Sequence, residues 1–252
     1  MRAAGCVFAE EEARLLGEAA RTPAGLEAMV GQREKGLPLE QVVGWADFCG
    51  LRILVDPWVF VPRPRSEFLV ATAVSLASGA SPVIVDLCCG TGALGLAVAA
   101  RLAAAGRAAG LHAADIDPAA GGCARRNVEP AGGRVYQGDL FAPLPAELRG
   151  RVTVLICNAP YVPTGDIALL PPEARDYEPR TALDGGSDGL AVLRRAAAEA
   201  PRWLAPGGVL LVETSDPQAP LMTRVMTAAG LTGRVHRCAE YESTVVTGTA
   251  PG

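Results

Sequence analysis

Residues 83–95, "VIVDLCCGTGALG", join an apolar strand to the start of a helix through a glycine-rich loop. The loop contains Gly90, Gly92 and Gly95 in the spacing GxGxxG, and Asp115 ends the next apolar segment about 20 residues later. Glycines here let the backbone approach a ligand closely, and a carboxylate at the second strand end accepts hydrogen bonds from ribose hydroxyls. The stretch predicts a nucleotide-type cofactor at the carboxyl end of a sheet. By itself it fits NAD as well as S-adenosylmethionine.

Strands and helices alternate from residue 82 onward. We predict strands at 82–88, 110–117, 133–141, 152–158, 207–215, 233–239 and 243–249, and helices at 92–105, 118–128, 190–204 and 219–230. A Pro/Gly/Asp-rich insertion occupies 163–189, and Ser66 is expected to cap the helix that precedes the first of these strands. This alternation requires a parallel sheet with helices on both faces. The predicted fold class is α/β, with a Rossmann-like sheet of seven strands.

A smaller unit precedes the sheet. We predict that residues 1–60 form a helical and hairpin appendage and that residues 61–252 form the main domain. Within the appendage, the pattern of 8–35 predicts two short helices, and that of 41–61 predicts a pair of strands around Gly50.

Composition excludes several classes of function. The 252 residues carry a net charge of −4 and contain no uninterrupted apolar run of about 18 residues. The N-terminus becomes acidic at Glu10, where a secretory signal would become apolar, so we expect a cytoplasmic protein without a membrane partner. An acidic chain argues against direct DNA binding. The seven cysteines include no CxxC pair, and only His112 and His236 accompany them, so no metal site is predicted.

Residues at the strand ends favour S-adenosylmethionine over NAD. Asp86 lies inside the first strand, where a dinucleotide fold usually keeps apolar residues. Its carboxylate can order the glycine loop and face the ammonium group of S-adenosylmethionine. Asp139 ends the third strand and is suited to accept from an adenine amino group, with Leu140 and Phe141 beside the ring. These carboxyl ends line the crevice where open α/β sheets bind ligands.

The fourth strand ends in "NAPY", residues 158–161. The side-chain oxygen of Asn158 and the carbonyl of Ala159, fixed by Pro160, can accept from both N–H groups of an NH2. This would aim the nitrogen lone pair at a methyl group in line with its sulfonium bond. Tyr161 offers a ring face for stacking a planar group and excludes water. The stretch predicts N-methylation of an amide or amine.

Taken together, these motifs resemble the HemK-type (PrmC) protein-glutamine methyltransferases, which are class I, seven-stranded, S-adenosylmethionine-dependent enzymes. The resemblance covers about residues 38–249 and includes "VPRPRSEFLV", "DLCCGTGALG", "AADIDPAA", "NAPYVP", "YEPRTALDGGSDGL" and "PGGVLLVE". The family methylates the glutamine of the Gly-Gly-Gln motif in peptide-chain release factors. The resemblance therefore implies a release factor as the protein substrate.

The resemblance also implies roles for individual residues. The cofactor would contact Asp86, Cys88, Cys89, Gly90, Thr91, Gly92, Asp115, Asp139, Leu140 and Asn158. The glutamine side chain would be held by Asn158, Ala159, Pro160 and Tyr161. Arg63 and Glu67 would shape the substrate entrance, while Glu178 and Arg180 would order the lid loop.

The sequence departs from the family pattern in several places. Ala159 replaces the first proline of the family's Asn-Pro-Pro-Tyr motif, Cys88 and Cys89 replace a glycine and a small residue, and Arg65 replaces an aspartate. The N-terminal helical region is also shorter than the family's. The short N-terminus and Ala159 favour an alternative, an N-methyltransferase of an amino acid or secondary metabolite; the retained "YEPRTALDGGSDGL" loop argues against it.

Three other interpretations remain open but less favoured. An adenine-N6 DNA methyltransferase should carry a basic recognition domain that this acidic chain lacks. A non-catalytic relative would not need the intact acceptor pair, and a dehydrogenase would bind NAD.

Overall fold

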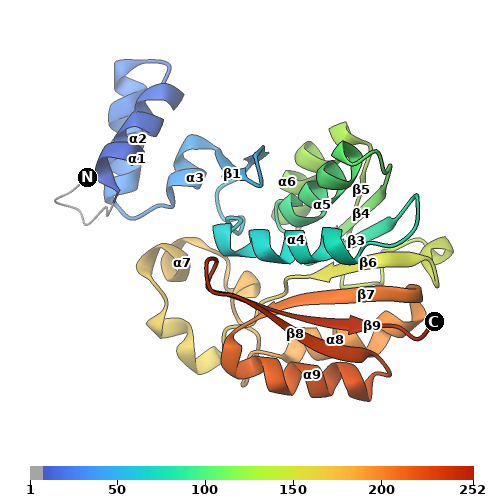
Figure 1. Cartoon of the computed structure of the whole chain (residues 1–252). Coiled ribbons are helices and arrows are strands. Elements are labelled where there is room, and N and C mark those ends of the chain that lie inside the picture. Colours follow the sequence, from blue (N-terminus) through green and yellow to red (C-terminus); the bar gives the residue numbers. More distant parts are fainter. Residues whose placement is uncertain (1–7) are drawn as a thin grey trace.

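The computed structural model describes residues 8–252 (Figure 1). Residues 1–7, which include Cys6 and the start of the predicted appendage, lie outside the described part. A seven-stranded sheet has the order β5-β4-β3-β6-β7-β9-β8. Its strands are β3 (Val83–Leu87), β4 (Gly110–Asp115), β5 (Arg134–Gln137), β6 (Val152–Cys157), β7 (Leu204–Thr214), β8 (Thr232–Cys238) and β9 (Ser243–Thr249).

The sheet is mixed. Strands β3 to β7 pair in parallel, but β9 runs antiparallel to both β7 and β8. The expectation of a parallel sheet is therefore correct for five strands and wrong for the last two. The reason is the short connection between β8 and β9, in which Glu242 has φ +47°. Neighbouring strands joined by so short a turn must be antiparallel.

Alternation along the strands builds two hydrophobic layers. In β6, Val154 and Ile156 pack into one cluster with α4 (Glu67–Leu76) and α5 (Ala93–Ala104). Leu155 and Cys157 pack into the opposite cluster with α8 (Ala191–Glu199) and α9 (Ala219–Ala228). Figure 1 shows α4, α5 and α6 (Pro118–Val128) on one side of the sheet and α8 and α9 on the other. Successive side chains of a strand point to opposite faces of the sheet, so alternate residues of β6 enter different clusters.

The N-terminal unit contains α1 (Ala9–Ala19), α2 (Pro23–Glu34) and α3 (Leu39–Val43), followed by the antiparallel pair β1 (Trp45–Phe48) and β2 (Leu51–Leu54). The two helices within 8–35 are confirmed. The hairpin turns at Cys49 and Gly50, which both have positive φ, and it is shorter than predicted: its ladder covers only Trp45–Phe48 and Leu51–Leu54. Hydrogen bonds and an ion pair cross residue 60, so the division at that residue stays a prediction.

The insertion after β6 contains a short helix. Two 3-10 turns, Thr164–Leu169 and Arg180–Ala182, flank α7 (Pro172–Tyr177). Glu173 on α7 forms an ion pair of 2.6 Å with Arg33 of α2, which also pairs with the buried Glu12 of α1. The Tyr177 hydroxyl donates to the Lys35 carbonyl at 2.5 Å. The N-terminal helices therefore hold this insertion in place.

Candidate active site

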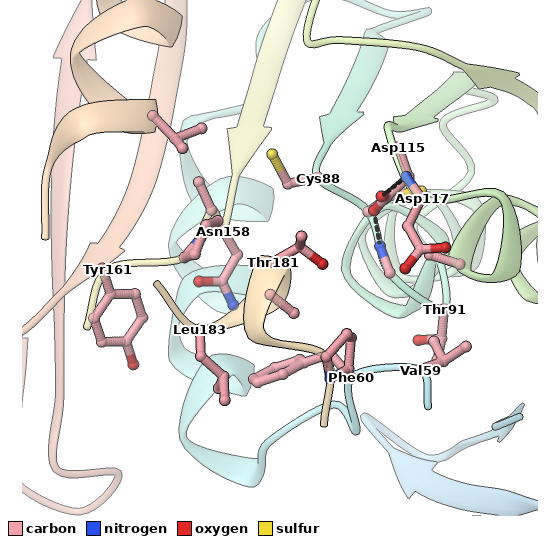
Figure 2. Close-up of a pocket in the computed structure, with 18 of the residues that line it drawn as sticks. Val59, Phe60, Cys88, Thr91, Asp115, Asp117, Asn158, Tyr161, Thr181 and Leu183 are labelled. Atoms are coloured by element: carbon pink, nitrogen blue, oxygen red, sulfur yellow. Dashed lines mark hydrogen bonds between the residues drawn. The ribbon is translucent and has the colours of Figure 1, made fainter. Parts of the chain in front are cut away.

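A cavity of about 400 Å³ lies at the carboxyl ends of the parallel strands. Residues after four strands line it: Cys88, Cys89, Gly90 and Thr91 after β3, Asp115, Ile116 and Asp117 at and after β4, Gly138, Asp139 and Leu140 after β5, and Asn158, Ala159, Pro160 and Tyr161 after β6. Figure 2 shows Asn158 and Tyr161 toward one end and Thr91, Asp115 and Asp117 toward the other. The fold thus brings all four predicted strand ends to one cavity.

Asp115 orders the glycine loop. Its Oδ2 accepts from the Gly90 amide at 2.8 Å, and its Oδ1 accepts from the Asp117 amide at 2.9 Å (Figure 2). Burial raises the pKa of this carboxyl, and the amide hydrogen bonds oppose the shift. A side chain at Gly90 would meet no atom within 4 Å, so the loop leaves open space at that glycine. The carboxylate and the open backbone together suit a ligand that carries hydroxyl donors.

Asp86 lies away from the cavity lining. It is 0 % exposed, and its Oδ2 accepts from the amide of Gly95 at 2.8 Å, near the start of α5. Its Oδ1 has no hydrogen-bond partner among residues 8–252. Burial raises the pKa of Asp86 to about 7, and the charge of Asp115 adds to the shift. The ordering role predicted for Asp86 is thus shared by two carboxylates: Asp115 accepts from Gly90 in the loop, and Asp86 accepts from Gly95 in the helix that follows.

Gly92 also lies outside the cavity lining, in close packing with α6. It has φ +78° and precedes α5, and a Cβ there would lie 2.6 Å from a methyl of Val128. It does not line the cavity, whereas Asp139 and Leu140 do. Asp139 pairs with Arg195 at 2.5 Å. Phe141, predicted beside the cofactor ring, instead stacks on Trp203 at 5.4 Å between ring centroids and is absent from the lining.

The acceptor candidates after β6 are free to bind. Within residues 8–252, neither the side chain of Asn158 nor the carbonyl of Ala159 has a hydrogen-bond partner. Both residues line the cavity, as do Pro160 and Tyr161. Two unengaged oxygens on adjacent residues can bind the two N–H groups of one amide.

A glycine-rich turn at residues 185–189 packs closely against the backbone of residues 160 and 161. A Cβ at Gly189 would lie 2.1 Å from the Tyr161 carbonyl oxygen, and one at Gly185 would lie 2.6 Å from that of Pro160. The Nε2 of Gln218 donates to the Tyr161 carbonyl at 2.9 Å and to the Asp188 carbonyl at 3.0 Å. Sequence reasoning missed these contacts, although the "DGGSDG" run contains two of the glycines.

The Tyr161 side chain is anchored by a polar network. Its hydroxyl donates to Oε1 of Glu213 at 3.1 Å and accepts from Nη2 of Arg65 at 2.6 Å. Arg65 also donates to Glu213 at 3.0 Å, and the Ser66 hydroxyl donates to the second oxygen of Glu213 at 2.6 Å. Ser66 is therefore no cap of α4. Burial and the Glu213 charge raise the pKa of Tyr161 well above its ordinary value.

Of the four residues predicted at the substrate entrance and the lid loop, one lines the cavity and three do not. Arg63 lines the cavity and pairs with the buried Glu178 at 2.6 Å. Glu178 also accepts from the Val61 amide at 3.1 Å, and burial raises its pKa. Glu67 accepts from the Cys49 amide, and Arg180 pairs with Asp184. Glu67, Glu178 and Arg180 do not line the cavity.

Several lining residues were not predicted. They include Trp58, Val59, Phe60, Leu170, Thr181, Leu183 and Val192. The apolar "WVF" run directly before the "VPRPRS" motif was a usable signal for the first three. No group of three metal-ligating side chains occurs in the described residues, and no helix among them is long and apolar enough to cross a membrane.

Comparisons with known proteins agree with this geometry. A family model described as methyltransferase small domain matches residues 64–169. The release factor glutamine methyltransferase of Geobacter sulfurreducens is 39% identical over 209 residues, which cover 82% of this chain and 71% of that protein. The enzyme of the same name from Mycolicibacterium smegmatis is 43% identical over 194 residues, covering 77% and 67%.

One further relative carries a different name. The 4-amino-L-phenylalanine/4-methylamino-L-phenylalanine methyltransferase of Streptomyces pristinaespiralis is 36% identical over 199 residues, covering 77% of this chain and 66% of that protein. Among solved structures, a methyltransferase from Pyrococcus furiosus has a TM-score of 0.57 at 17% identity and covers 81% of this chain and 90% of that one. This likeness shows the class I methyltransferase fold.

Proposed function

Because the chain belongs to the release factor glutamine methyltransferase family, we propose that it methylates the side-chain amide of the Gly-Gly-Gln glutamine in a peptide-chain release factor. It is an S-adenosylmethionine-dependent N-methyltransferase. The observation that carries the proposed acceptor is the pair of unengaged oxygens, Asn158 Oδ1 and the Ala159 carbonyl, in the same cavity as Asp115.

The residues fit the cofactor. The cavity volume lies in the range of small-molecule sites, roughly 300–1,000 Å³, and its lining contains an ordered carboxylate and a loop with open space at Gly90. We propose that Cys88, Cys89, Gly90 and Thr91 hold the methionine end, Asp115 the ribose, and Asp139 and Leu140 the adenine. When bound, S-adenosylmethionine supplies a methyl group on a positively charged sulfur.

Catalysis by this chain is then mainly orientation. Asn158 and the Ala159 carbonyl accept from the two N–H groups of the glutamine amide and turn the nitrogen lone pair toward the donor end of the cavity. Pro160 fixes the backbone next to the acceptor carbonyl. The Tyr161 ring excludes water, while its hydroxyl is already engaged by Arg65 and Glu213.

No strong base is required for the proton. Alkylation makes the remaining N–H acidic, so that proton can pass to water. Tyr161 is not suited to take it, because its raised pKa keeps the hydroxyl protonated. Asp86 is not suited either, because it lies outside the cavity lining. We therefore assign the chemistry to positioning and to the acceptor pair.

A second candidate function is N-methylation of a small aromatic amine or amino acid. The relative that acts on 4-amino-L-phenylalanine favours it, at 36% identity over most of this chain. The same two acceptor oxygens would serve an arylamine. Under this alternative, the side chains of Phe60 and Leu183, which line the cavity, would contact the aromatic ring.

Two further properties belong to the proposal. The six cysteines among residues 8–252 are free thiols, which supports a reducing compartment, and we propose the cytoplasm. The net charge of −4 supports a protein substrate over DNA.

A competition assay tests the acceptor. Purified chain is incubated with S-adenosylmethionine and equal concentrations of an unmodified release factor and 4-amino-L-phenylalanine, and both are analysed by mass spectrometry. We expect the mass gain of one methyl group on the release-factor glutamine. Methylation of the amino acid alone would replace the first candidate with the second.

A further inference from the structure

Trp58 has an unusual position for a large apolar residue. Its side chain is 58 % exposed and lines the cavity, whereas the next residue, Val59, is 1 % exposed. The backbone of Trp58 has φ +65°, in the left-handed region that side chains other than glycine rarely adopt. Three of the five such residues in 8–252 line this cavity: Trp58, Cys88 and Leu140. Strained backbone of this kind collects at functional sites.

The surrounding contacts hold this conformation. Val59 packs against Ala120 and Cys123 of α6, and its amide donates to the Asp56 carbonyl at 3.2 Å. On the other side, Nε2 of Gln41 donates to the Val59 carbonyl at 3.2 Å. With Val59 fixed in the core, the left-handed turn leaves the preceding indole at the cavity and in solvent.

The contacts of α6, the helix against which Val59 packs, show which end of the cavity Trp58 faces. Asp117 caps this helix, and its amide donates to Asp115, the proposed ribose ligand. Asn127 of the same helix donates to the Thr91 carbonyl in the glycine loop at 2.9 Å. In Figure 2, Val59 lies on the same side of the view as Thr91 and away from Tyr161. Trp58 therefore belongs to the cofactor end rather than the acceptor end.

We propose that Trp58 is a cofactor-binding residue whose indole covers the adenosine part of S-adenosylmethionine. The proposal rests on the methyltransferase activity of the cavity. Ile116, 60 % exposed and also in the lining, follows Asp115 directly and offers a second apolar surface for the nucleoside. An indole and an adenine ring stack through their faces, and a stacked tryptophan shields the ring from water.

Binding of S-adenosylhomocysteine, measured by calorimetry without any acceptor, tests this role in W58A, W58F and W58G. We expect W58A to bind roughly tenfold more weakly, which corresponds to about 1.4 kcal/mol, and W58F to bind almost as the wild type does. W58G relieves the backbone strain, so its melting temperature should rise while its affinity falls as in W58A. The matched control is W45F, because Trp45 lies in β1 against Arg52 and outside the lining.

Tryptophan emission gives a second readout. Added S-adenosylhomocysteine should change the emission of the wild type and W45F but not of W58F. Wild-type affinity in W58A and W58G would overturn the proposal, as would an unchanged affinity together with a raised KM for the acceptor. If the wild type itself fails to bind S-adenosylhomocysteine, the cofactor assignment fails and the assignment of Trp58 fails with it, which distinguishes the two cases.

Discussion

The hydroxyl of Tyr161 donates to the carboxylate of Glu213 across 3.1 Å, which joins the acceptor segment after β6 to the buried end of β7. Glu213 is 2 % exposed and has both oxygens engaged, one by Ser66 and the other by Arg65 and Tyr161. The Tyr161 ring beside the proposed glutamine site is thus held through its hydroxyl, and the Tyr161 carbonyl is held by a hydrogen bond from Gln218.

Glu213 should therefore act as a positioning residue. E213Q keeps the shape but weakens the charge-assisted hydrogen bonds to Arg65 and Tyr161. We expect the KM for the release factor to rise roughly tenfold with the affinity for S-adenosylhomocysteine unchanged. Y161F, which keeps the ring, should shift KM in the same direction by less. A loss of cofactor affinity equal to the rise in KM would show that Glu213 serves only the general fold.

Gly189 should be required for the close packing behind the acceptor segment. G189A places a methyl group 2.1 Å from the Tyr161 carbonyl oxygen at φ +77°. The matched control is G79A, because Gly79 has the same φ and a methyl group added there would meet no atom within 4 Å. Denaturant unfolding should show a loss of about 1 kcal/mol for G79A and of at least about 2 kcal/mol for G189A. Equal losses would mean that backbone strain alone explains both.

Asp86 should make stability depend on pH. Its pKa rises from 3.8 in the unfolded chain to about 7 in the fold through burial, so the folded chain retains a proton there that the unfolded chain has released. Its stabilising contribution is full below pH 3.8 and is lost as the pH rises to about 7. D86N can still accept from Gly95 and does not titrate. Its melting temperature should fall less with pH over this range than that of the wild type, and parallel profiles would contradict the assignment.

Glu173 should link the N-terminal helices to acceptor binding. It lines the cavity and pairs with Arg33, which keeps Glu12 as a second partner. E173Q should raise the KM for the release factor by roughly threefold, since the pair is partly exposed, and should leave cofactor affinity unchanged. The control is E18Q, which removes the exposed pair between Arg14 and Glu18 on α1. If both variants match the wild type in KM, the ion pair does not hold the insertion for catalysis.

Much of this arrangement could be predicted because strand ends carry local signals. The GxGxxG loop, Asp115 and the NAPY segment each follow an apolar strand, and parallel strands place such ends at one edge. The predicted strands all occur, and β9 has the predicted bounds, 243–249. The antiparallel pairing of the last two strands was missed although a signal was present: the predicted strands 233–239 and 243–249 leave only residues 240–242 between them, which is too short for a crossover.

Contacts between distant residues could not be predicted. Arg65 and Glu213 lie 148 residues apart, and only the tertiary fold brings them together. Asp86 was predicted to order the glycine loop and to face the cofactor; its hydrogen-bond partner is the Gly95 amide, which the sequence did not indicate, and its role toward the cofactor stays a prediction. Phe141 was misplaced because residues 138–140 leave the strand, with positive φ at Gly138 and Leu140, and turn the next side chain into the core.

The most direct test of the account is the N158A variant, assayed by mass spectrometry of the Gly-Gly-Gln peptide from a treated release factor and by binding of S-adenosylhomocysteine in the same preparation. We predict that the wild type adds one methyl group to the glutamine. N158A should lose at least about 100-fold in rate while its affinity for S-adenosylhomocysteine stays largely intact. Glutamine methylation at the wild-type rate by N158A would contradict the claim that Asn158 holds the acceptor amide.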